Sequence, residues 1–578
     1  MLPSCKVARA TASATGGVSK KVMLGDFAHE RKGRARGFPL AETRGFRDNG
    51  AMKHVTGALK PIRPYYRREV RLDLPPGAHF MYRGDNNMSP RTEPSMYLGP
   101  DGFCSEFSSD DVIIVGHAGQ QQYTLVGAVT ALRSLTFLTL IKKGANLHAV
   151  EVRQPDIAEG ETPEEVIVLK GSDWRALLAE YARLTAERMQ VPPLDTRRNL
   201  TGYCTWYYYY ADVTEKDFLE NVEAMRRHLD GAYRAQVMQI DDGYQTFQGD
   251  WNDQDPSWPT PLREIGRRII GTGMRAGIWL MPFQASTASR VFREHPEWFV
   301  TDDSGAPKVA KGWSPPPDDL WACLDASQPA VQEHLARVFR TFRSWGYTYF
   351  KMDGLGFGLM EGGRADPAAT PVSAFRQGLQ AIRDAVPDAH LLGCCPPFMA
   401  CLGYIDSARV SGDTHASWGP IKRCMHAVLS RWWMIDTFFR CDPDTMMARQ
   451  DRGSTTPGEA RVSILTGIVT GVAITSDNLN TITPERLALL SRAATIRMRD
   501  ARPVDFKLWG HPSVFAGTVD GRRAVAAINE TETAREFAFE ALTLDPAREA
   551  EEILHPLGAR KYTVTVPPHD AVLLVQGA

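Results

Sequence analysis

The sequence is poor in the features that mark membrane, nucleic-acid-binding and secreted proteins. None of its apolar stretches is long enough to span a bilayer. Its formal net charge is only −1, so it lacks the basic excess that favours nucleic acid or an anionic membrane as a partner. Residues 1–10 contain no apolar h-region, and a secretory signal is therefore not expected. These absences favour a globular protein with neither a nucleic-acid nor a membrane partner.

Disulfide and metal motifs are scarce as well. The nine cysteines are an odd number with no CxxC pair, and Cys394 and Cys395 are neighbours, which makes a bridge between them difficult. This usage is typical of reduced, cytoplasmic thiols. No HxH or HExxH phrase is present, so the motifs that usually accompany a catalytic divalent metal are missing. We expect a cytoplasmic protein that needs no cofactor or metal.

Length and texture together predict three domains. At 578 residues the chain exceeds one ordinary hydrophobic core. Short alternating apolar runs from about residue 37 to 168 predict a β-sandwich, a helix over 174–189 follows, and β texture returns after Pro503. We therefore divide the chain into an N-terminal sandwich with its linker helix (1–195), a central domain (196–500) and a small C-terminal sandwich (501–578). The first fifty residues contain more basic than acidic side chains, which is typical of a solvated tail or an edge strand.

Strands and helices alternate throughout the central domain. The helical pattern covers residues 215–228, 262–274, 330–345 and 372–386. Short apolar runs alternate with these stretches, and eight of them are candidate strands: 202–206, 237–241, 276–280, 349–353, 391–395, 408–410, 438–441 and 472–476. Eight strands with helices between them over roughly 300 residues predict an α/β fold of the (β/α)8 type, a TIM barrel.

Two carboxylate-bearing phrases follow such strands. Lys351 and Asp353 end one run, and Arg409 and Asp413 follow another. Active sites of parallel barrels gather at the carboxyl ends of the strands, so the two aspartates are expected to face each other if the chain bends at residues 411–412. Lys351 points the same way as Asp353, two residues on, and its charge favours the ionised carboxylate. Two opposed carboxyl groups are what cleavage of a glycosidic bond requires.

The gap between these carboxyl groups decides the stereochemistry. A separation of about 5–5.5 Å predicts retention of configuration through a covalent glycosyl-enzyme, whereas about 6.5–9.5 Å predicts inversion. Taken alone, each phrase also has a structural interpretation. Asp413 could cap a helix from a loop, and Lys351 with Asp353 could be a structural ion pair at a strand end.

A third acidic phrase, Asp241-Asp242-Gly243, closes the second candidate strand. Neighbouring residues of a strand face opposite sides, but Gly243 lets the backbone leave the strand at once, so both carboxylates can turn toward one site. Such a pair could accept two sugar hydroxyls. The same pair could instead hold a divalent metal ion.

Aromatic residues accompany these acids. Flat sugar faces pack on aromatic rings, and a tryptophan also supplies an N–H donor. Trp206 and Trp279 stand at strand ends, and Trp418 follows Asp413 closely. We expect these three to contact the sugar, although a tryptophan fills a hydrophobic core just as often.

Together these phrases resemble glycoside hydrolase family 36, the microbial α-galactosidases related to melibiases and raffinose synthases. The resemblance extends over the predicted barrel, from about residue 201 to 478. It rests on Gly202 to Tyr207, Gln239 to Gln245, Gly249 to Trp251, Gly277 to Phe283, His295 to Trp298, Lys351 to Asp353, Asp406 to Asp413 and Asp442 to Asp444. One departure concerns a phrase that is often Leu-Gly-Cys-Gly in the family, where Cys395 replaces the last glycine.

The resemblance implies a role for each matching residue. It implies that Asp353 is the nucleophile and Asp413 the acid/base of a retaining glycosidase. It also implies that Asp241 and Asp242 bind the 4- and 6-hydroxyls of galactose. Substrate contacts are further expected, from the resemblance or from position, for Lys351, Arg409, Cys394, Trp206, Trp279 and Trp418.

We therefore predict a cofactor-free, retaining α-galactosidase that acts on short α-galactosides, either as a monomer or as a homo-oligomer. A transglycosylase would use the same acids, and an α-N-acetylgalactosaminide or another α-glycoside could be the substrate. A catalytically silent sugar-binding protein is disfavoured, because binding alone needs no opposed acids. A metal-dependent barrel hydrolase stays open as a rival, and a chelator would abolish its activity.

Overall fold

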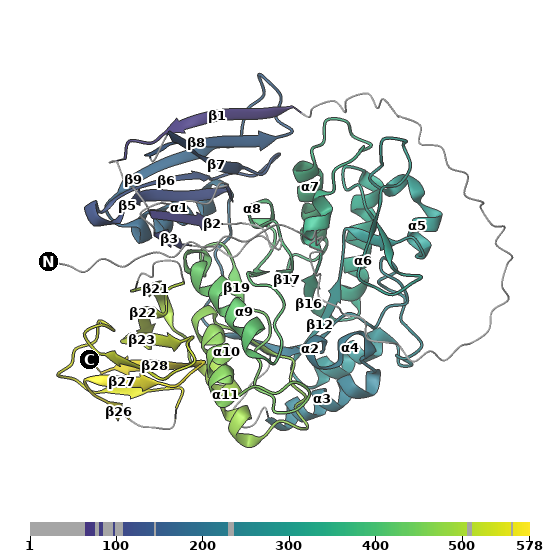
Figure 1. The fold of residues 1–578 in the computed structure, drawn as a ribbon. Helices are drawn as coiled ribbons and strands as arrows, with labels where there is room; N and C mark the ends of the chain where they lie inside the picture. Colours follow the sequence, from purple (N-terminus) through teal and green to yellow (C-terminus); the bar gives the residue numbers. More distant parts are fainter. Residues whose placement is uncertain are drawn as a thin grey trace, which may run out of the picture. The chain divides into compact units, whose positions relative to one another are not determined.

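The computed structural model describes residues 64–74, 80–84, 96–98, 108–143, 146–228, 236–505, 511–555 and 559–577. The basic segment of the first fifty residues lies outside these ranges. Within them, antiparallel sheets precede and follow one parallel sheet (Figure 1). No helix in the described ranges is both long and apolar enough to cross a membrane. The division at residues 195 and 500 stays a prediction.

Two antiparallel sheets come before the parallel sheet. The first contains, in spatial order, β1 (Tyr65–Arg71), β8 (Asn146–Pro155), β7 (Phe137–Lys143) and β4 (Ser108–Asp110). The second contains β3 (Met96–Leu98), β2 (Phe80–Gly84), β5 (Val112–His117), β6 (Gln122–Ala128) and β9 (Val166–Gly171). Their buried side chains meet in one core, in which Ile113 and Val126 of the second sheet pack with Leu138 and Val150 of the first. This is the two-layer β-sandwich expected from the alternating runs.

The linker helix α1 (Trp174–Arg188) begins and ends within one residue of its predicted bounds. Asp173 caps its first turn by accepting a hydrogen bond from the backbone N–H of Arg175 at 2.9 Å. One face, which includes Leu178 and Tyr181, is buried. The Tyr181 hydroxyl donates to the carbonyl oxygen of Ala128 at the end of β6, 2.7 Å away, so this helix is fixed to the sandwich.

The central sheet confirms the predicted barrel. Its strands are parallel and neighbour one another in chain order: β10 (Leu200–Cys204), β11 (Val237–Ile240), β12 (Arg275–Leu280), β16 (Tyr347–Met352), β17 (His390–Gly393), β18 (Ser407–Arg409), β19 (Arg440–Asp442) and β20 (Val472–Thr475). β20 pairs with β10. Just beyond β19, Met446 bridges to Thr475 in the parallel sense, which nearly closes the ring. All eight expected strands are present.

Helices alternate with these strands, as expected from the periodicity (Figure 1). They are α2 (Trp206–Tyr209), α3 (Glu215–His228), α4 (Leu262–Gly271), α5 (Arg290–Glu294), α6 (Pro329–Ser344), α7 (Pro371–Ala385), α8 (Phe398–Cys401), α9 (Trp418–Ser430), α10 (Pro457–Thr470) and α11 (Pro484–Thr495). A small antiparallel sheet of β13 (Gln284–Ser286), β15 (Leu320–Cys323) and β14 (Val309–Lys311) is inserted between β12 and β16. This insertion was not predicted.

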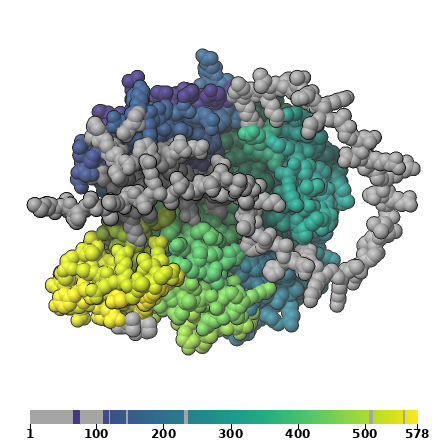
Figure 2. Space-filling model, viewed as in Figure 1, coloured from purple at the N-terminus to yellow at the C-terminus, as the bar shows by residue number. Residues whose placement is uncertain are grey.

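The C-terminal region has two antiparallel sheets. The larger contains β21 (Arg499–Pro503), β22 (Val514–Val519), β23 (Arg522–Asn529), β28 (Asp570–Gln576), β25 (Ala550–Glu552) and β26 (Ala559–Arg560), and the smaller pairs β24 (Arg535–Ala538) with β27 (Thr563–Val566). Phe537 and Val564 of the smaller sheet pack with Val525 and Leu574 of the larger. Asp570 of β28 accepts two hydrogen bonds from Arg461 of α10, at 2.8 and 2.7 Å. In Figure 2, the yellow atoms of the C-terminal region lie beside green atoms from earlier in the chain.

Candidate active site

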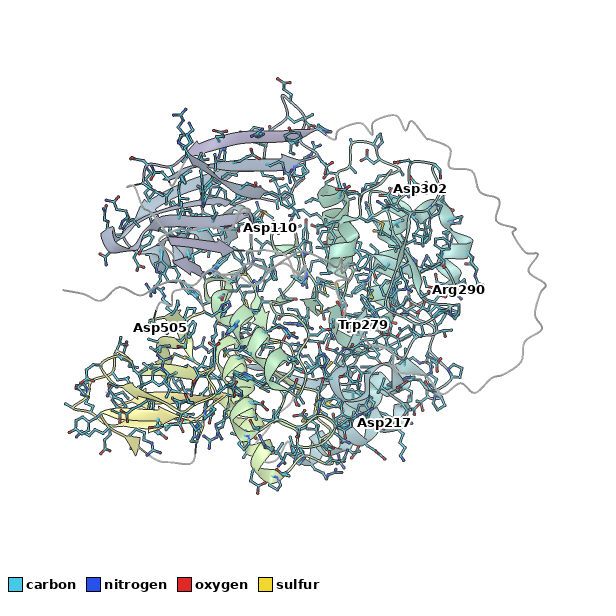
Figure 3. All side chains as sticks on the ribbon, viewed as in Figure 1. Asp110, Asp217, Trp279, Arg290, Asp302 and Asp505 are labelled. Carbon is cyan, nitrogen blue, oxygen red and sulfur yellow. The ribbon has the colours of Figure 1, made fainter. Side chains whose placement is uncertain are left out.

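Polar side chains gather where the parallel strands end. Because these strands all run the same way, their carboxyl ends meet at one end of the barrel. The predicted residues stand at or near those ends: Asp241 and Asp242 after β11, Trp279 in β12 (Figure 3), Lys351 in β16, Asp353 after it, Cys394 after β17, Arg409 in β18 and Asp413 in the following loop. The fold therefore assembles residues that are far apart in the sequence.

Asp241 is the centre of a buried charge cluster. The ammonium of Lys351 lies 2.8 Å from Asp241 Oδ2, and both side chains are buried. Gln239 Nε2 donates to the same oxygen at 2.6 Å, and the thiol of Cys204 donates at 3.2 Å. Burial is the largest single effect and acts to lower the pKa of Lys351. Asp241, together with the weaker effects of Cys204, Cys394 and Asp353, outweighs burial, so this pKa lies well above its ordinary value. Lys351 is therefore a fixed positive charge.

The ion pair of Lys351 differs from the one that the sequence suggested. We expected its ammonium to act mainly on Asp353, whereas its contact at 2.8 Å is with Asp241. Asp353 acts on the pKa of Lys351 more weakly than Asp241 does. The reason is that Asp241 turns inward at the end of β11, while Asp353 is held by two other donors.

Asp353 is half-buried, and each of its oxygens accepts a hydrogen bond. The indole Nε1 of Trp279 donates to Oδ2 at 3.1 Å, and the backbone N–H of Gly354 donates to Oδ1 at 2.7 Å. Trp279 is itself held edge-on against Trp251, with ring centroids 5.8 Å apart. These two N–H donors fix the direction of the carboxylate.

Arg409 links two carboxylates across the end of β18. Its side chain is almost inaccessible, and its Nη2 lies 3.0 Å from Asp413 Oδ1 while its Nη1 lies 3.2 Å from Asp444 Oδ1. The hydroxyl of Tyr207 also donates to Asp413 Oδ1, at 3.0 Å. The side chain of Asp413 is nevertheless 64% exposed. This carboxylate is thus held from the protein side and open to solvent on the other.

The two partners of Arg409 have pKa values shifted in opposite directions. Desolvation acts to raise the pKa of Asp413, but the charge and hydrogen bond of Arg409 outweigh it, so this pKa lies below its ordinary value. Burial raises the pKa of Asp444 to about 7, although Arg409 opposes the shift. Asp444 also accepts the backbone N–H of Thr414 at 2.8 Å, which ties the loop of Asp413 to the end of β19.

The raised pKa of Asp444 predicts a pH-dependent stability. Folded Asp444 holds its proton up to about pH 7, whereas an unfolded aspartate has a pKa of about 3.9. Its contribution is therefore complete below about pH 4 and is lost as the pH rises through about 7, by at most about 4 kcal/mol. In Asp444→Asn, we expect the free energy of unfolding to fall less between pH 4.5 and 7.5, as measured by urea denaturation.

An exposed aspartate provides the control for this prediction. Asp384→Asn, on α7 and away from the barrel end, should show the wild-type loss of stability over the same pH range. If Asp444→Asn loses as much stability as the wild type, then folded Asp444 is already ionised at low pH.

Asp242 is also buried, and its sequence neighbours hold it. Gln245 Nε2 donates to Asp242 Oδ1 at 2.6 Å, and Gln248 Nε2 donates at 3.3 Å. Burial raises the pKa of Asp242 to about 6, although the amide of Gln245 favours the charged form. The turn after Asp242 requires glycine, because Gly243 has a φ of +117° and a Cβ there would lie 2.7 Å from the carbonyl oxygen of Ala211.

The remaining predicted residues differ in their surroundings. Cys394 lies beside Asp353, and its sulfur accepts from Arg409 Nη1 at 3.5 Å. Trp206 begins α2 rather than ending a strand; it is half-buried and packs against the apolar interior of the barrel. The ring of Trp418 stacks on His569 of the loop before β28, with centroids 4.4 Å apart. A sugar contact of either tryptophan stays a prediction.

Several residues of the site were not among the predicted ones. Tyr207, Gln239 and Asp444 each contact one of the charged groups directly. All three lie inside phrases that the sequence comparison with family 36 had already singled out. Asp444 had the clearest signal, since Asp442-Pro443-Asp444 follows a strand as the other acids do. Tyr207 and Gln239 resemble ordinary core residues in sequence, and only the fold shows that they face the acids.

Ligand atoms suited to a metal ion occur at one place in the described part of the chain. Asp353, Cys394 and Cys395 each offer one atom there, and these atoms lie within 4.8 Å of one another. Asp241 and Asp242 are occupied instead by Lys351 and by side-chain amides. The competing metal interpretation of the Asp241-Asp242 pair is therefore not supported by their contacts.

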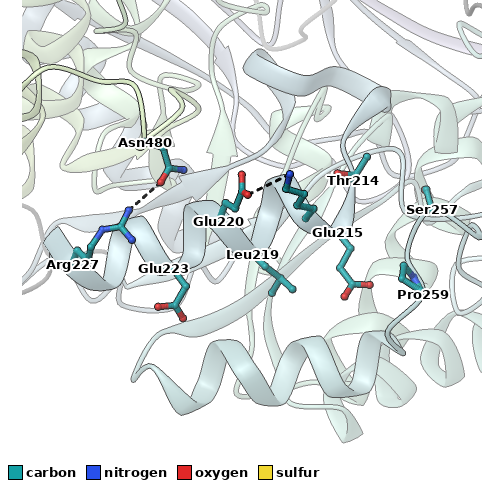
Figure 4. A pocket seen from close by; sticks show the side chains of 10 residues that line it. Thr214, Glu215, Leu219, Glu220, Glu223, Arg227, Ser257, Pro259 and Asn480 are labelled. Carbon is teal, nitrogen blue, oxygen red and sulfur yellow. Dashed lines mark hydrogen bonds and ion pairs between the residues drawn. The ribbon is translucent and has the colours of Figure 1, made fainter.

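A hollow of about 580 Å³ lies on the outer face of α3 and has no such chemistry (Figure 4). Glu215 is held there by the backbone N–H and hydroxyl of Thr260, at 2.8 and 2.6 Å. Arg227 donates to Asn480 at 3.0 Å. Both of these charged side chains thus have local hydrogen-bond partners.

Comparison with known proteins agrees with this geometry. The family model described as Melibiase matches residues 161–353, which confirms the resemblance expected from the motifs. An A type blood alpha-D-galactosamine galactosaminidase of Flavonifractor plautii is 31% identical over 132 residues, or 22% of this chain and 12% of that protein. Alpha-galactosidase 1 of Pediococcus pentosaceus is 21% identical over 201 residues, or 33% of this chain and 26% of that protein. The matches thus span only a small part of these relatives.

Solved structures share the fold more widely. TtGalA, an alpha-galactosidase from Thermus thermophilus solved in complex with stachyose, aligns with a TM-score of 0.61 and 23% identity over 74% of this chain and 93% of that one. The GH36 alpha-galactosidase AgaA from Geobacillus stearothermophilus aligns with a TM-score of 0.58 and 12% identity over 88% and 76%. At these identities the likeness concerns the fold.

Proposed function

This chain resembles the melibiase family of α-galactosidases, and on that premise we propose that it is a retaining α-galactosidase. The observation that supports this most is that two carboxylates at one end of the barrel have different surroundings. Asp353 is fixed through both oxygens by N–H donors, and Asp413 is anchored by Arg409 yet open to solvent. A nucleophile needs a fixed direction, and an acid/base needs access to the leaving group and to water.

In the proposed first step, Asp353 attacks the anomeric carbon of the galactoside. The bond from this carbon to the leaving oxygen breaks, and Asp413 gives its proton to that oxygen. The product is a galactosyl ester of Asp353 and a free alcohol. In the second step Asp413 takes a proton from water, whose oxygen attacks the same carbon and releases Asp353. Each step inverts the configuration once, so the first sugar released has the configuration of the substrate.

Asp413 must hold a proton when the substrate is bound, although in the free site its pKa lies below the ordinary value. Its exposed carboxylate would be covered by the leaving group. Removal of water from a carboxylate raises its pKa. Arg409 divides its charge between Asp413 and Asp444, so Asp413 does not receive the full effect of this cation. Both factors favour a proton on Asp413 in the complex.

The buried cluster around Asp241 would bind the sugar. Lys351 is charged and can donate to sugar hydroxyls, while Asp241 and Asp242 offer carboxylate oxygens as acceptors. The family resemblance implies that Asp241 and Asp242 bind the 4- and 6-hydroxyls. An axial 4-hydroxyl, as in galactose, would then be favoured over an equatorial one.

The stereochemical course is the direct test of this mechanism. With an aryl α-galactoside as substrate, the first galactose released is expected to be the α-anomer. Proton NMR during the first minutes, before mutarotation, distinguishes the anomers. Early accumulation of β-galactose would mean that Asp353 activates water instead of attacking the sugar, and the retaining mechanism would be wrong.

A second substrate has specific support. The relative from Flavonifractor plautii is named as acting on α-D-galactosamine, so an α-galactosaminide, free or N-acetylated, is the second candidate. A panel of aryl α-glycosides that differ at the 2-position separates the two, through kcat/KM for each. Transglycosylation uses the same acids, and an added sugar acceptor reveals it as a new disaccharide.

We also propose that the protein acts in the cytoplasm on a small-molecule α-galactoside. The seven cysteines of the described residues are free thiols, which agrees with a reducing compartment. Both a monomer and a homo-oligomer are compatible with this site, since the residues described above all come from one chain.

A further inference from the structure

Two thiols and a carboxylate meet at the proposed nucleophile. The sulfur atoms of Cys394 and Cys395 and a carboxylate oxygen of Asp353 lie within 4.8 Å of one another. A tetrahedral zinc ion with bonds of about 2.3 Å to sulfur and about 2.1 Å to oxygen requires ligand atoms about 3.5–3.8 Å apart. Side-chain shifts of about 1 Å would therefore complete the geometry of a metal site.

The backbone fixes these three residues relative to one another. The N–H of Cys394 donates to the carbonyl oxygen of Met352 at 2.7 Å. In the opposite direction, the N–H of Leu355 donates to the carbonyl oxygen of Cys394 at 3.2 Å, and the N–H of Gly356 donates to the carbonyl oxygen of Cys395 at 2.9 Å. The two turns that follow β16 and β17 are thus joined on both sides of Asp353. Ligands held in this way lose little conformational entropy when an ion binds.

Cys395 stands in a conformation that cysteine rarely adopts. Its φ is +49°, in the left-handed region where a glycine is free of strain. A residue with a Cβ costs about 1 kcal/mol or more there. The chain thus has a second thiol beside Asp353 at a position whose backbone suits glycine. Strain of this kind is common where a side chain has a function.

The chemistry of the three side chains decides which ion they could hold. A metal ion binds the thiolate form of cysteine and displaces the thiol proton. Two thiolates and one carboxylate are a donor set that prefers soft or borderline ions such as Zn²⁺ and Cd²⁺ over Mg²⁺ or Ca²⁺.

We propose that Cys394, Cys395 and Asp353 bind a thiophilic divalent metal ion, and that this ion inhibits the enzyme. The two thiols would release their protons to solvent as the metal–sulfur bonds form, and a water molecule would complete the tetrahedron. The ion occupies the carboxylate that must attack the sugar, so metal and galactoside exclude each other. The inhibition rests on the proposed function, whereas the metal site itself does not.

Metal binding is tested by titrating the reduced full-length protein with Cd²⁺ and recording the ultraviolet charge-transfer band of cadmium–thiolate bonds. We expect Cys395→Gly to weaken the tightest site at least tenfold. Glycine suits the left-handed backbone, so the variant is expected to fold, and Cys395→Ser provides a second variant of nearly native size. Cys401→Ala removes a buried cysteine of α8 outside the cluster and should leave the titration unchanged. Titrations that coincide for wild type and both Cys395 variants would overturn the site.

Inhibition is tested separately with Zn²⁺ and an aryl α-galactoside. We expect Zn²⁺ to raise KM without changing kcat, a chelator to restore the rate, and Cys395→Gly to need at least tenfold more Zn²⁺ for half-inhibition. Equal sensitivity of wild type and Cys395→Gly would contradict the inhibitory role. If no α-galactoside is hydrolysed at all, the proposed function fails, and the cadmium titration still decides whether the metal site exists.

Discussion

Asp353→Ala is expected to lower kcat on an aryl α-galactoside by about 10⁴-fold or more, because in the proposed mechanism the glycosyl ester forms on Asp353. Stability should change little, since Asp353 is half-buried and its two donors, the indole of Trp279 and the N–H of Gly354, can bind water instead. Initial rates measure the loss, and thermal unfolding measures the fold.

Chemical rescue makes this prediction sharper. Alanine leaves space at the sugar face that Asp353 occupied, and azide can attack the anomeric carbon from there. We expect azide to restore turnover and to give the β-galactosyl azide, inverted relative to the substrate. Asp384→Ala, on the exposed face of α7, should keep the wild-type rate. A near-normal rate in Asp353→Ala, without azide, would show that the nucleophile has been misassigned.

Asp413→Ala is expected to lower kcat/KM by about 10²- to 10⁴-fold on substrates with an alkyl leaving group, because general acid catalysis typically contributes that much. An aryl galactoside with an acidic phenol should be far less affected in the first step, since its leaving group departs without a proton. The measurement is kcat/KM for a series of leaving groups, plotted against their pKa values.

The slope of that plot separates catalysis from positioning. A steeper dependence on leaving-group pKa in Asp413→Ala than in the wild type supports the acid role. Asp413→Asn keeps an oxygen that can accept from Arg409 and Tyr207 but has no proton to transfer. It should therefore give the same steep slope as Asp413→Ala. An equal loss on every substrate would mean that Asp413 positions the sugar and another group supplies the proton.

The barrel could be predicted because its signals are local. Each strand is a short apolar run, and each expected run became a strand of the central sheet. The insertion of β13, β14 and β15 escaped prediction, since its strands have only three or four residues each and mixed polarity. Trp206 was assigned to a strand end because sequence periodicity cannot locate the residue at which β10 gives way to α2.

The acids of the site could be predicted, but their partners could not. Aspartates at strand ends stand out against apolar runs, and strand ends converge in any parallel barrel. Which oxygen meets which cation depends on side-chain directions across several strands. Lys351 therefore looked like a partner of Asp353, its near neighbour, although its contact lies on Asp241, 110 residues away. Asp444 was overlooked as a partner of Arg409, because the sequence does not show which side chains of different strands point toward each other.

The Lys351–Asp241 ion pair has a consequence for how the chain finds its native alignment. A slip of one residue along β16 would move Lys351 to the opposite side of the strand. Asp241 and Lys351 would then each lose their ionic partner, and breaking a buried ion pair costs about 3–5 kcal/mol. A misaligned strand that buries as many apolar side chains is thus less stable than the native alignment, because of the same charges that would bind the sugar. If the proposed function is correct, substrate recognition and the choice of a single native topology have one physical origin in this protein.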